Sequence, residues 1–581
     1  VSIANDQPEP EFRAVRSLAL RVPLDGAGGI RGALDGGALA PVPDSDGLWI
    51  HQDKDNHYAM RTADGVAEGE RAAGVAVAED NGTRVMAIIR DFWQTYPSGC
   101  AIKPDGIHVR LLPRLEPDTY AGDTDAPWFY KLYAWFRDGN YLFRAGQLTQ
   151  HDVYVYYDVP GSAQDAQQAA AWLANPLLPQ APPAYLCGTG VLGRALAPRT
   201  PGLWDHYERY VDEGFLASQQ DREQRRTYGW MHYGDWYGER YCNFGNNEYG
   251  MDWALAVQWM RTGDRRLFDR GLEMARHCST VDTRYGAFTE PARCIVWEHC
   301  FNHCGTALTL DELQIPPDDQ DGQKYLAQFG RMRTGAMDPQ GHVFQEGNWI
   351  YAALTGDPWL RDAAERVCAG QADKLTPAFD FGIERSGGWP LINATAAYRF
   401  SGNPYYLNAA RIMVERCLRR EDPVSGGWPH TPPTGETGGQ RVVGGKAFAV
   451  GILSHGLLRY IEQEPEDRPE VRAMLVRAAD WLRNESWNPG KGFRYITNAP
   501  NHRDAGHRGI SCLLNAEIIA YAYEETGDRK YIEFWNEIMA GAFDRPPSGM
   551  GKAFTQSIRQ TVFGLDRARQ WGATSAPAAT P

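Results

Sequence analysis

The feature that most constrains this chain is a short Gly-Asp corner that recurs in its C-terminal two-thirds. It reads Thr262-Gly263-Asp264 and returns as Thr355-Gly356-Asp357, Ser401-Gly402-Asn403 and Thr526-Gly527-Asp528. Each copy lies between two apolar runs, where Gly suits the left-handed end of one helix and Asp or Asn caps the next. The first two gaps, 93 and 46 residues, fit one repeat period or its double. Helical hairpins repeated in this way predict a solenoid or a closed ring, and a closed ring carries a central cleft at one end.

The runs between these corners divide into two layers. Six runs from Trp204 onward are rich in small and apolar residues, as helices packed on several sides must be. They cover about 247–262, 298–313, 342–355, 389–401, 445–462 and 509–526. More highly charged runs at 264–280, 357–371, 404–420, 467–486 and 529–543 are typical of an outer layer. Six inner and about six outer helices predict an (α/α)6 toroid.

The first 160 residues follow a different pattern. Short alternating stretches such as VRSLALRVPL, TRVMAIIRDF and GIHVRLLP are separated by Gly, Asp and Pro, which predicts strands and turns. A short helix is expected at 164–174. The predicted fold is α+β and multidomain: an antiparallel β-sandwich over 1–160, a linker over 161–203, the toroid over 204–570 and a disordered tail over 571–581.

Composition excludes several classes of protein. The net charge is −14 without a dense Lys/Arg block, which argues against nucleic acid or an anionic membrane as a partner. No run of 18 apolar residues occurs, so no membrane span is predicted. The ten cysteines form no CxxC pair and are interpreted as buried thiols. We expect a secreted or periplasmic protein, with the cytoplasm as the alternative and the oligomeric state open.

The densest polar segment runs from Trp230 to Gly250, directly ahead of an apolar run. Its second half, Asn243-Phe-Gly-Asn-Asn-Glu-Tyr-Gly250, is rich in amide, acidic and aromatic side chains. A core does not favour this mixture, whereas a carbohydrate site does. The structural alternative is that Asn246 caps the helix and Glu248 lies in its first turn.

Two predicted helix starts carry histidines. His299 and His303 are four residues apart and share a helix face, as do His342 and Glu346. The first pair could hold Zn²⁺ with Glu298 as a base, but the HExxH order and a third ligand are missing. Site histidines, or one site and one core histidine, are the favoured interpretation, so no metal is predicted.

Loops expected at the entrances of the inner helices combine glycine with aromatic or cationic residues. The pentapeptide SGGWP occurs at 386–390 and again at 425–429, where glycine permits close approach and the ring offers a face to a pyranose. Ordinary turns and internal duplication explain the same pattern. Cationic residues at these entrances favour an acidic ligand. The predicted substrate-binding residues are Trp236, Asn246, Arg385, Trp389, Trp428, His430, Lys446, Arg494, Tyr495, His507 and Arg508.

Several of these motifs also resemble a known family. The segments YGD…NNEYG…TGD…ARH…VDT, GHVFQEG…LTGD and GGWPL…Y resemble the toroid of the exo-rhamnogalacturonan lyase-like (YetA-like) proteins. RDFWQTYP, IHVRLLP and YLFRAGQLTQHDVYVYY resemble the β-sandwich that precedes it. Where that family usually reads NNEYD, this chain has Gly250.

The resemblance implies β-elimination at a uronate in a rhamnogalacturonan-like polysaccharide. Such a lyase needs a group that neutralises the carboxylate, a base for the C5 proton and an acid for the departing O4. Toroid lyases use Asn, His and Tyr for these tasks, and we expect a His base, a Tyr acid and Arg385 or Arg508 on the uronate. The candidate catalytic residues are His232, Tyr233, Tyr237, Asn247, Glu248, His299, His303, His342 and Glu346.

Three alternatives stay open. A glycoside hydrolase on the same ring, such as a glucuronidase or an unsaturated uronide hydrolase, would use two carboxyl groups among Asp235, Glu239, Glu248, Glu298 and Glu346. A non-catalytic carbohydrate-binding protein and a sugar epimerase are weaker alternatives. No organic cofactor is expected, and Ca²⁺ stays open only because loop Asp and Asn residues could supply oxygen ligands.

Overall fold

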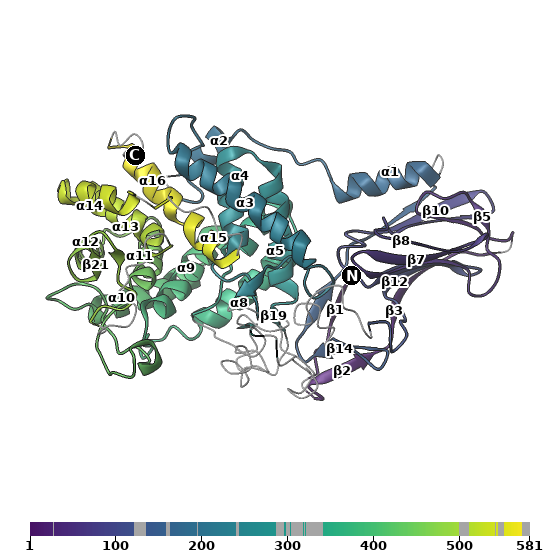
Figure 1. Cartoon of the computed structure of the whole chain (residues 1–581), viewed down its shortest axis with the longest axis horizontal. Helices are drawn as coiled ribbons and strands as arrows, with labels where there is room; N and C mark the ends of the chain where they lie inside the picture. The colour runs from purple at the N-terminus through teal and green to yellow at the C-terminus, as the bar shows by residue number, and fades with distance from the viewer. Residues whose placement is uncertain are drawn as a thin grey trace.

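The computed structural model separates a strand-rich part from a helical part (Figure 1). It describes the chain except residues 8, 27, 121–134, 159–162, 194–195, 240–242, 286–294, 298–302, 304–317, 319, 321–340, 499–509, 541, 544–550 and 572–581. None of the helices in the described ranges is long and apolar enough to cross a membrane.

The four predicted corners are confirmed, and all four have the same construction. At the first, Gly263 takes φ 76° and the Asp264 carboxylate accepts the Arg266 N–H at 3.0 Å. The Thr262 hydroxyl donates to the Gln258 carbonyl at 2.8 Å and accepts from the Asp264 N–H at 3.1 Å. The three other glycines have φ of 71°, 68° and 68° and the same capping bonds follow them. Local chemistry therefore sets each helix-to-helix turn.

The helices pair into hairpins. The inner members are α4 (Met251–Thr262), α7 (Glu346–Thr355), α9 (Glu384–Ser401), α11 (Ala447–Ile461) and α13 (Ile510–Thr526). Their outer partners are α5 (Arg265–Thr280), α8 (Pro358–Ala372), α10 (Pro404–Arg420), α12 (Pro469–Trp481, continued by a π turn at Leu482–Ser486) and α14 (Lys530–Met539). A 3-10 turn, η1, covers Thr434–Glu436.

The series of inner helices closes on itself. Contacts run from α4 to α7, α9, α11 and α13, and then through α16 (Thr561–Arg569) and α15 (Gly551–Ile558) back to α4. Helix α3 (Asp205–Arg225) packs outside α15. The predicted inner helix at 298–313 falls, apart from His303, outside the described residues, and the sequence analysis missed α15 and α16. Each described inner helix is followed by an outer partner that returns the chain, so the inner helices point in the same direction and their N-termini lie at one end of the ring.

The first SGGWP copy corrects a prediction, because it is not a loop. Residues 386–390 lie inside α9, including Pro390. A Cβ on Gly388 would lie 2.9 Å from the Leu453 backbone, so this glycine lets α9 and α11 pack closely. The second copy is a turn in which Gly426 and Gly427 take φ of 74° and 71°. Identical pentapeptides thus serve helix packing in one place and a reversal in the other.

The strand-rich part contains two large antiparallel sheets. One has the order β16-β10-β9-β4-β5 and the other β3-β12-β11-β6-β7-β8. Smaller sheets are β13-β14-β2 and β1-β15. The bounds are β1 Ser2–Ala4, β2 Phe12–Val15, β3 Leu18–Pro23, β4 Arg31–Leu34, β5 Ala40–Pro41, β6 Leu48–Lys54, β7 His57–Thr62, β8 Gly65–Gly69, β9 Val75–Asp80, β10 Thr83–Ile89, β11 Ser98–Lys103, β12 Gly106–Leu112, β13 Phe136–Arg137, β14 Asn140–Arg144, β15 Leu148–Gln150 and β16 Val153–Tyr157.

One apolar core joins the two large sheets. Val85 and Ile89 of β10 pack in it together with Ile50 of β6 and Ile102 of β11. Two helices, α1 (Ala163–Ala174) and α2 (Pro183–Gly188), lie in the segment that leads to the ring. Helix α1 occupies the predicted position and lies against the sheets, in contact with β9 (Figure 1).

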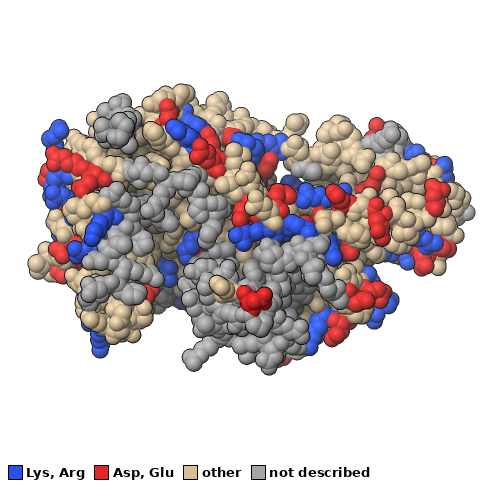
Figure 2. All heavy atoms as spheres, in the orientation of Figure 1, with Lys and Arg blue, Asp and Glu red and all other residues tan. Residues whose placement is uncertain are grey.

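The two parts are joined by polar contacts. The buried Asp55 carboxylate, between β6 and β7, accepts two hydrogen bonds at 2.7 Å from Arg226 at the end of α3. Arg276 of α5 forms an ion pair with Asp152 at 3.0 Å. Near this junction basic and acidic side chains lie side by side on the surface (Figure 2).

Candidate functional site

A strained turn precedes α4. Asn246, Asn247 and Tyr249 have φ of 46°, 54° and 71°, followed by Gly250 at 66°. Side chains other than glycine rarely adopt this region, and such residues concentrate at functional sites. The Asp235 carboxylate holds the turn by accepting the N–H groups of Asn246 at 2.8 Å and Asn247 at 3.3 Å.

The turn carries Glu248 to the end of the ring where the inner helices begin. Glu248 Oε1 lies 3.8 Å from His342 Nε2, and its Oε2 lies 2.9 Å from Lys552 Nζ. His342 precedes α7, and Lys552 is in the first turn of α15. Glu248 and His342 are buried, whereas the Lys552 side chain is 28% exposed. We call Glu248, Tyr249, His342 and Lys552 the ring-end cluster.

Aromatic rings pack against this cluster from inside the protein. Trp389 packs edge-on against Tyr249 at 5.6 Å and against Phe344 at 4.6 Å. Arg559 lies 4.7 Å from the Trp389 ring, and its Nε donates to the Tyr249 carbonyl at 2.8 Å. Glu346 is committed to an ion pair with Arg559. Trp389 and Glu346 therefore position Tyr249 from inside the protein, and Trp389 presents no open face for sugar stacking.

The phenol of Tyr249 retains its proton at neutral pH. Burial raises its pKa, and Lys552 and Arg385 act in the opposite direction while Glu248 adds to the increase. The influence of Arg385, from the first turn of α9, shows that this predicted uronate-binding residue lies near the ring-end cluster. A protonated phenol beside two cations can donate a proton to a leaving oxygen.

A second polar group lies at the starts of α9 and α11. His430 Nδ1 lies 3.6 Å from Glu384 Oε2, and Lys446 is paired with Glu436. Lys446 Nζ also lies 5.1 Å from the centre of the Tyr495 ring. Phe448 connects this group to the aromatic rings below the ring-end cluster, since it packs against that apolar set and lies 5.7 Å from Tyr495.

The structure therefore brings together part of the predicted set. Predicted residues at or beside the ring-end cluster are Glu248, His342, Glu346, Arg385, Trp389, His430, Lys446 and Tyr495. Arg494 precedes Tyr495 and is half-buried, next to the short hairpin β21 (Trp487–Asn488) and β22 (Gly492–Phe493). His299, His507 and Arg508 lie outside the described residues.

Other predicted residues lie elsewhere in the protein. Trp428 is buried in the helical core, where its Nε1 donates to the Cys417 carbonyl at 3.0 Å; with no ring face open to a sugar, it leaves the substrate-binding set. Trp236 is likewise packed beneath Gly245 and Gly551. The Tyr237 ring packs edge-on against Phe244 at 5.2 Å, on the hairpin of β17 (Tyr237–Glu239) and β18 (Asn243–Phe244).

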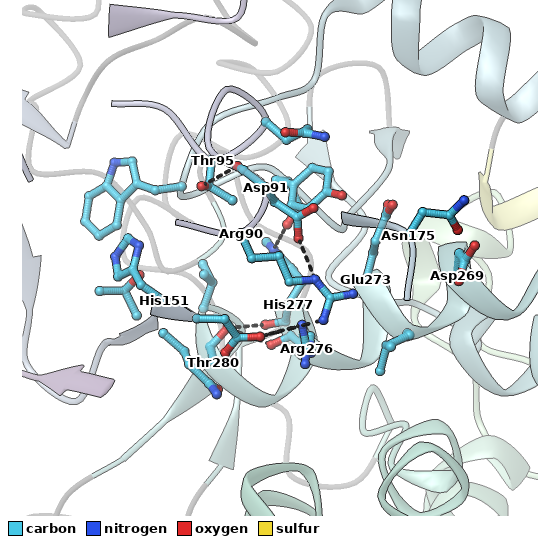
Figure 3. Close-up of a pocket in the computed structure, with 18 residues that line it drawn as sticks. Arg90, Asp91, Thr95, His151, Asn175, Asp269, Glu273, Arg276, His277 and Thr280 are labelled. Atoms are coloured by element: carbon cyan, nitrogen blue, oxygen red, sulfur yellow. Dashed lines mark hydrogen bonds and ion pairs between the residues drawn. The ribbon is translucent and has the colours of Figure 1, made fainter. Parts of the chain in front are cut away.

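Tyr233 lies at a cavity between the sheets and α5 (Figure 3). The cavity has a volume of about 370 Å³, and Asp91, His151, Glu273 and Arg276 are among the residues that line it. Burial raises the pKa of Asp91 to about 6. This cavity is separate from the ring-end cluster, because it opens on the outer helix α5 and on the sheets.

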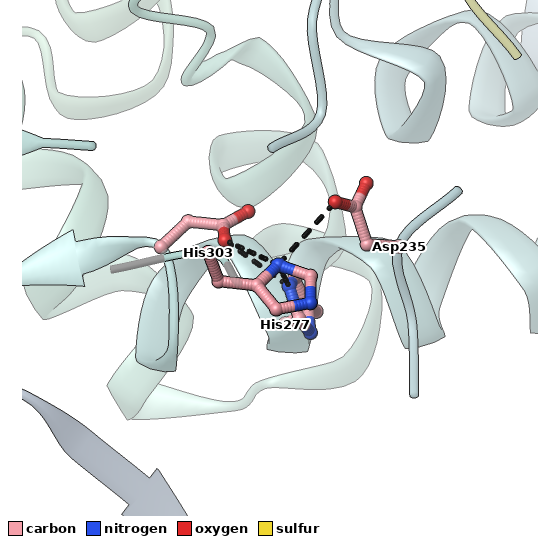
Figure 4. A group of neighbouring side chains, drawn as sticks. Asp235, His277 and His303 are labelled. Carbon is pink, nitrogen blue, oxygen red and sulfur yellow. Dashed lines mark hydrogen bonds and ion pairs between the residues drawn. The ribbon is translucent and has the colours of Figure 1, made fainter. Parts of the chain in front are cut away.

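His232 and His303 belong to a third, fully buried group. His232 Nδ1 lies 3.1 Å from His303 Nε2. The other ring nitrogen of His303 faces His277, Asp282 and Asp235 (Figure 4). One ligand-type atom from each of these four residues lies within 4.8 Å of the others. Such a group can hold a metal ion.

Sequence reasoning missed Tyr249, Lys552 and Glu384 at the ring end, and Asp235 and His277 as partners of His303. Tyr249 was visible as the aromatic residue of the NNEYG segment. Lys552 carried no local signal, because it lies about 300 positions from Glu248 and only ring closure brings the two together.

Comparisons with known proteins give distant relatives. No family model matches the chain. An uncharacterized protein, YetA of Bacillus subtilis (strain 168), is 25% identical over 362 residues, which is 54% of this chain and 41% of that protein. The chain thus spans about two-fifths of the length of this curated relative.

Solved structures that this chain matches at low similarity include three enzymes. An unsaturated glucuronyl hydrolase specific for heparin is 10% identical with a TM-score of 0.40, covering 63% of this chain and 98% of its own. A polysaccharide lyase is 12% identical with a TM-score of 0.40 and the same coverage. A sugar epimerase from a ruminal bacterium is 10% identical with a TM-score of 0.43, covering 62% of this chain and 98% of its own.

Proposed function

We propose that this chain is a carbohydrate-active enzyme that cleaves a uronic-acid-containing polysaccharide, rhamnogalacturonan-like, by β-elimination at the ring-end cluster. The observation that carries the proposal is the convergence of Glu248, His342 and Lys552 beside Tyr249, on a turn whose strained backbone is held from behind. Buried ionisable groups gathered from distant segments are typical of catalytic sites.

The electrostatics of this end of the ring favour an anionic ligand. The described inner helices begin here, and helix N-termini carry partial positive charge. Lys552 and Lys446, which pair with Glu248 and Glu436, and Arg385 in the first turn of α9 add cationic side chains around them. A uronate carboxylate interacts favourably with both, and it is the group that the motif resemblance to the exo-rhamnogalacturonan lyase-like family implies.

Each role of an elimination has a matching residue. Lys552 and Arg385 neutralise the substrate carboxylate, which makes the C5 proton more acidic. His342 accepts that proton, and Glu248 orients its ring. The electrons of the C5–H bond form the C4–C5 double bond as the C4–O4 bond breaks, and the Tyr249 phenol protonates the departing O4. Atoms and charges balance without a co-reactant.

Hydrolysis is the second candidate, because two carboxyl groups, Glu248 and Glu384, are buried at this end of the ring. Hydrolases place such a pair about 5–5.5 Å or 6.5–9.5 Å apart across the scissile bond. In this mechanism Glu248 or Glu384 would be indispensable, and His342 would only position its neighbour.

The test is ultraviolet absorbance of the unsaturated product during incubation with rhamnogalacturonan and glucuronate-capped oligosaccharides. A rise that is about 10²- to 10⁴-fold slower in His342→Ala and Tyr249→Phe supports elimination with these residues as base and acid. His206→Ala and Tyr185→Phe, at exposed positions of α3 and α2, are the matched controls and should retain full activity. Sugar release without new absorbance would replace elimination by hydrolysis. No reaction with any uronate substrate would overturn both.

A further inference from the structure

Four side chains from three separate segments meet inside the helical part, behind the strained turn. Asp235 precedes β17, His277 and Asp282 lie at the end of α5 and just after it, and His303 comes from a third segment further along the chain. Each is less than 5% exposed. We call these residues the histidine–aspartate cluster (Figure 4).

Their spacing matches a tetrahedral ligand set. His277 Nε2 lies 3.1 Å from both Asp282 Oδ1 and His303 Nδ1. His303 Nδ1 lies 3.4 Å from Asp282 Oδ1 and 3.5 Å from Asp235 Oδ2. Zinc bonds of about 2.0–2.1 Å to nitrogen and oxygen place tetrahedral ligand atoms roughly 3.3 Å apart. Four of the six separations are therefore close to those of a tetrahedral zinc site, and all four ligand atoms lie within 4.8 Å of one another.

The hydrogen bonds around the cluster orient the ligand atoms inward. His277 Nδ1 lies 2.9 Å from the Tyr233 carbonyl, which only accepts, so this nitrogen carries a proton. In the neutral ring Nε2 then presents a lone pair to Asp282, which is itself an acceptor. Two acceptors facing each other call for a cation or a second ring proton. Metal-bound histidines typically donate their other N–H in this way.

The charge of the two buried carboxylates also favours a bound cation. Within the described part of the chain, Asp235 and Asp282 form ion pairs only with histidines. Asp282 Oδ2 is buried and has no hydrogen-bond partner among the described residues. With neutral rings the cluster carries two negative charges in the interior, and one divalent cation cancels them.

We propose that Asp235, His277, Asp282 and His303 bind one Zn²⁺ ion with a structural role. Two nitrogen and two oxygen donors suit zinc better than calcium or magnesium, which favour oxygen ligands alone. Four protein ligands complete the coordination, as in structural rather than catalytic sites. Because Asp235 also holds the N–H groups of Asn246 and Asn247, the ion fixes the turn that carries Glu248.

Metal content tests the site without reference to activity. The full chain, equilibrated with Zn²⁺ and dialysed against metal-free buffer, should retain one zinc per chain by mass spectrometry. His277→Ala and Asp282→Asn should each reduce zinc affinity by more than about tenfold, since even partners outside a ligand set cost 10- to 100-fold. His342→Ala is the matched control, a buried histidine outside the cluster, and should retain the zinc.

Two further measurements on the wild-type protein keep the result independent of variant folding. A chelator should lower the melting temperature and added Zn²⁺ should restore it. Co²⁺ loaded in place of Zn²⁺ should give the visible absorption of a tetrahedral site with nitrogen and oxygen donors. Wild-type protein that retains no zinc, or His277→Ala protein that retains it fully, would overturn the proposal.

The effect of the ion on catalysis rests on the proposed function and is measured separately from zinc binding. If the ion fixes the turn, the metal-free protein should lose the uronate-cleaving activity and recover it with Zn²⁺. Zinc retained without any such activity would refute the proposed function and leave the metal site intact. Activity that is unchanged after complete zinc removal would show that the ion does not hold the turn in place.

Discussion

Replacing Glu517 of α13 with Gln should change how the stability of the helical ring depends on pH. The Glu517 carboxylate is buried between inner helices and accepts hydrogen bonds at 2.6 Å from His455 Nδ1 and from Arg459 Nη2. Burial alone would raise its pKa. Arg459, His455 and Arg567 overcome that effect and lower the pKa from 4.5 to about 2.

The magnitude follows from the difference between the two pKa values. A folded-state pKa below the unfolded value means that the charged carboxylate stabilises the fold, fully above about pH 4.5 and progressively less as pH falls toward 2. The difference corresponds to about 3 kcal/mol, of which about 2 kcal/mol is lost between pH 6 and pH 3. Glu517→Gln removes this dependence, because an amide does not titrate in this range.

The assay is urea unfolding followed by circular dichroism of the helices at pH 6 and pH 3. Glu517→Gln should be less stable than wild type by about 3–5 kcal/mol at pH 6, since it leaves buried cations without their partner. This difference should shrink by about 2 kcal/mol at pH 3. Glu213→Gln, at an exposed position of α3, is the control and should follow wild type at both values. A Glu517→Gln deficit that is equal at the two pH values would refute the assignment of the acid sensitivity to this carboxylate.

Two other substitutions test the packing of the fold. Gly388→Ala should lower the melting temperature, because a Cβ 2.9 Å from the Leu453 backbone forces α9 and α11 apart. The overpacking costs about 1–3 kcal/mol, which exceeds the roughly 1 kcal/mol that alanine gains over glycine in a helix. A higher melting temperature would contradict the close approach of the two helices. Asp55→Asn should destabilise the junction with Arg226 by about 3 kcal/mol, the low end for a broken buried pair, because Arg226 is 18% exposed. Limited proteolysis should then cut the chain between its two parts faster than in wild type, and an unchanged cleavage rate would show that the pair does not secure the junction.

The sequence predicted those features that depend on neighbouring residues. The corner at Thr262-Gly263-Asp264 is set by one left-handed glycine and one capping carboxylate, so its chemistry is visible within three positions. The paired helices on either side follow from apolar periodicity in the same way. Helix α9 shows the limit, because a glycine that permits close helix packing cannot be told from a glycine that makes a turn without knowing what lies opposite.

The site was predictable only in part for a similar reason. His303 was paired with His299, four residues away, because spacing along one helix is the information that a sequence offers. The structure surrounds His303 with Asp235 and His277, which are 68 and 26 positions away, and His299 lies outside the described residues. Lys552 meets Glu248 only because α15 returns to α4 when the ring closes.

The turn at 246–250 connects the ring-end cluster with the histidine–aspartate cluster. The strain of this turn indicates which of the two clusters depends on the other. Left-handed residues other than glycine cost about 1–3 kcal/mol each, so this turn persists only where its surroundings hold it. Asp235 binds two of its N–H groups, and the Asn246 side chain donates to the His303 carbonyl at 2.9 Å. Both anchors belong to the histidine–aspartate cluster, whereas His342 and Lys552 contact the Glu248 side chain that the turn carries. Loss of the histidine–aspartate cluster should therefore release Glu248, while Arg559 still holds the Tyr249 carbonyl, and loss of His342 or Lys552 should leave the cluster in place. That asymmetry distinguishes a structural ion behind the site from one that takes part in the chemistry.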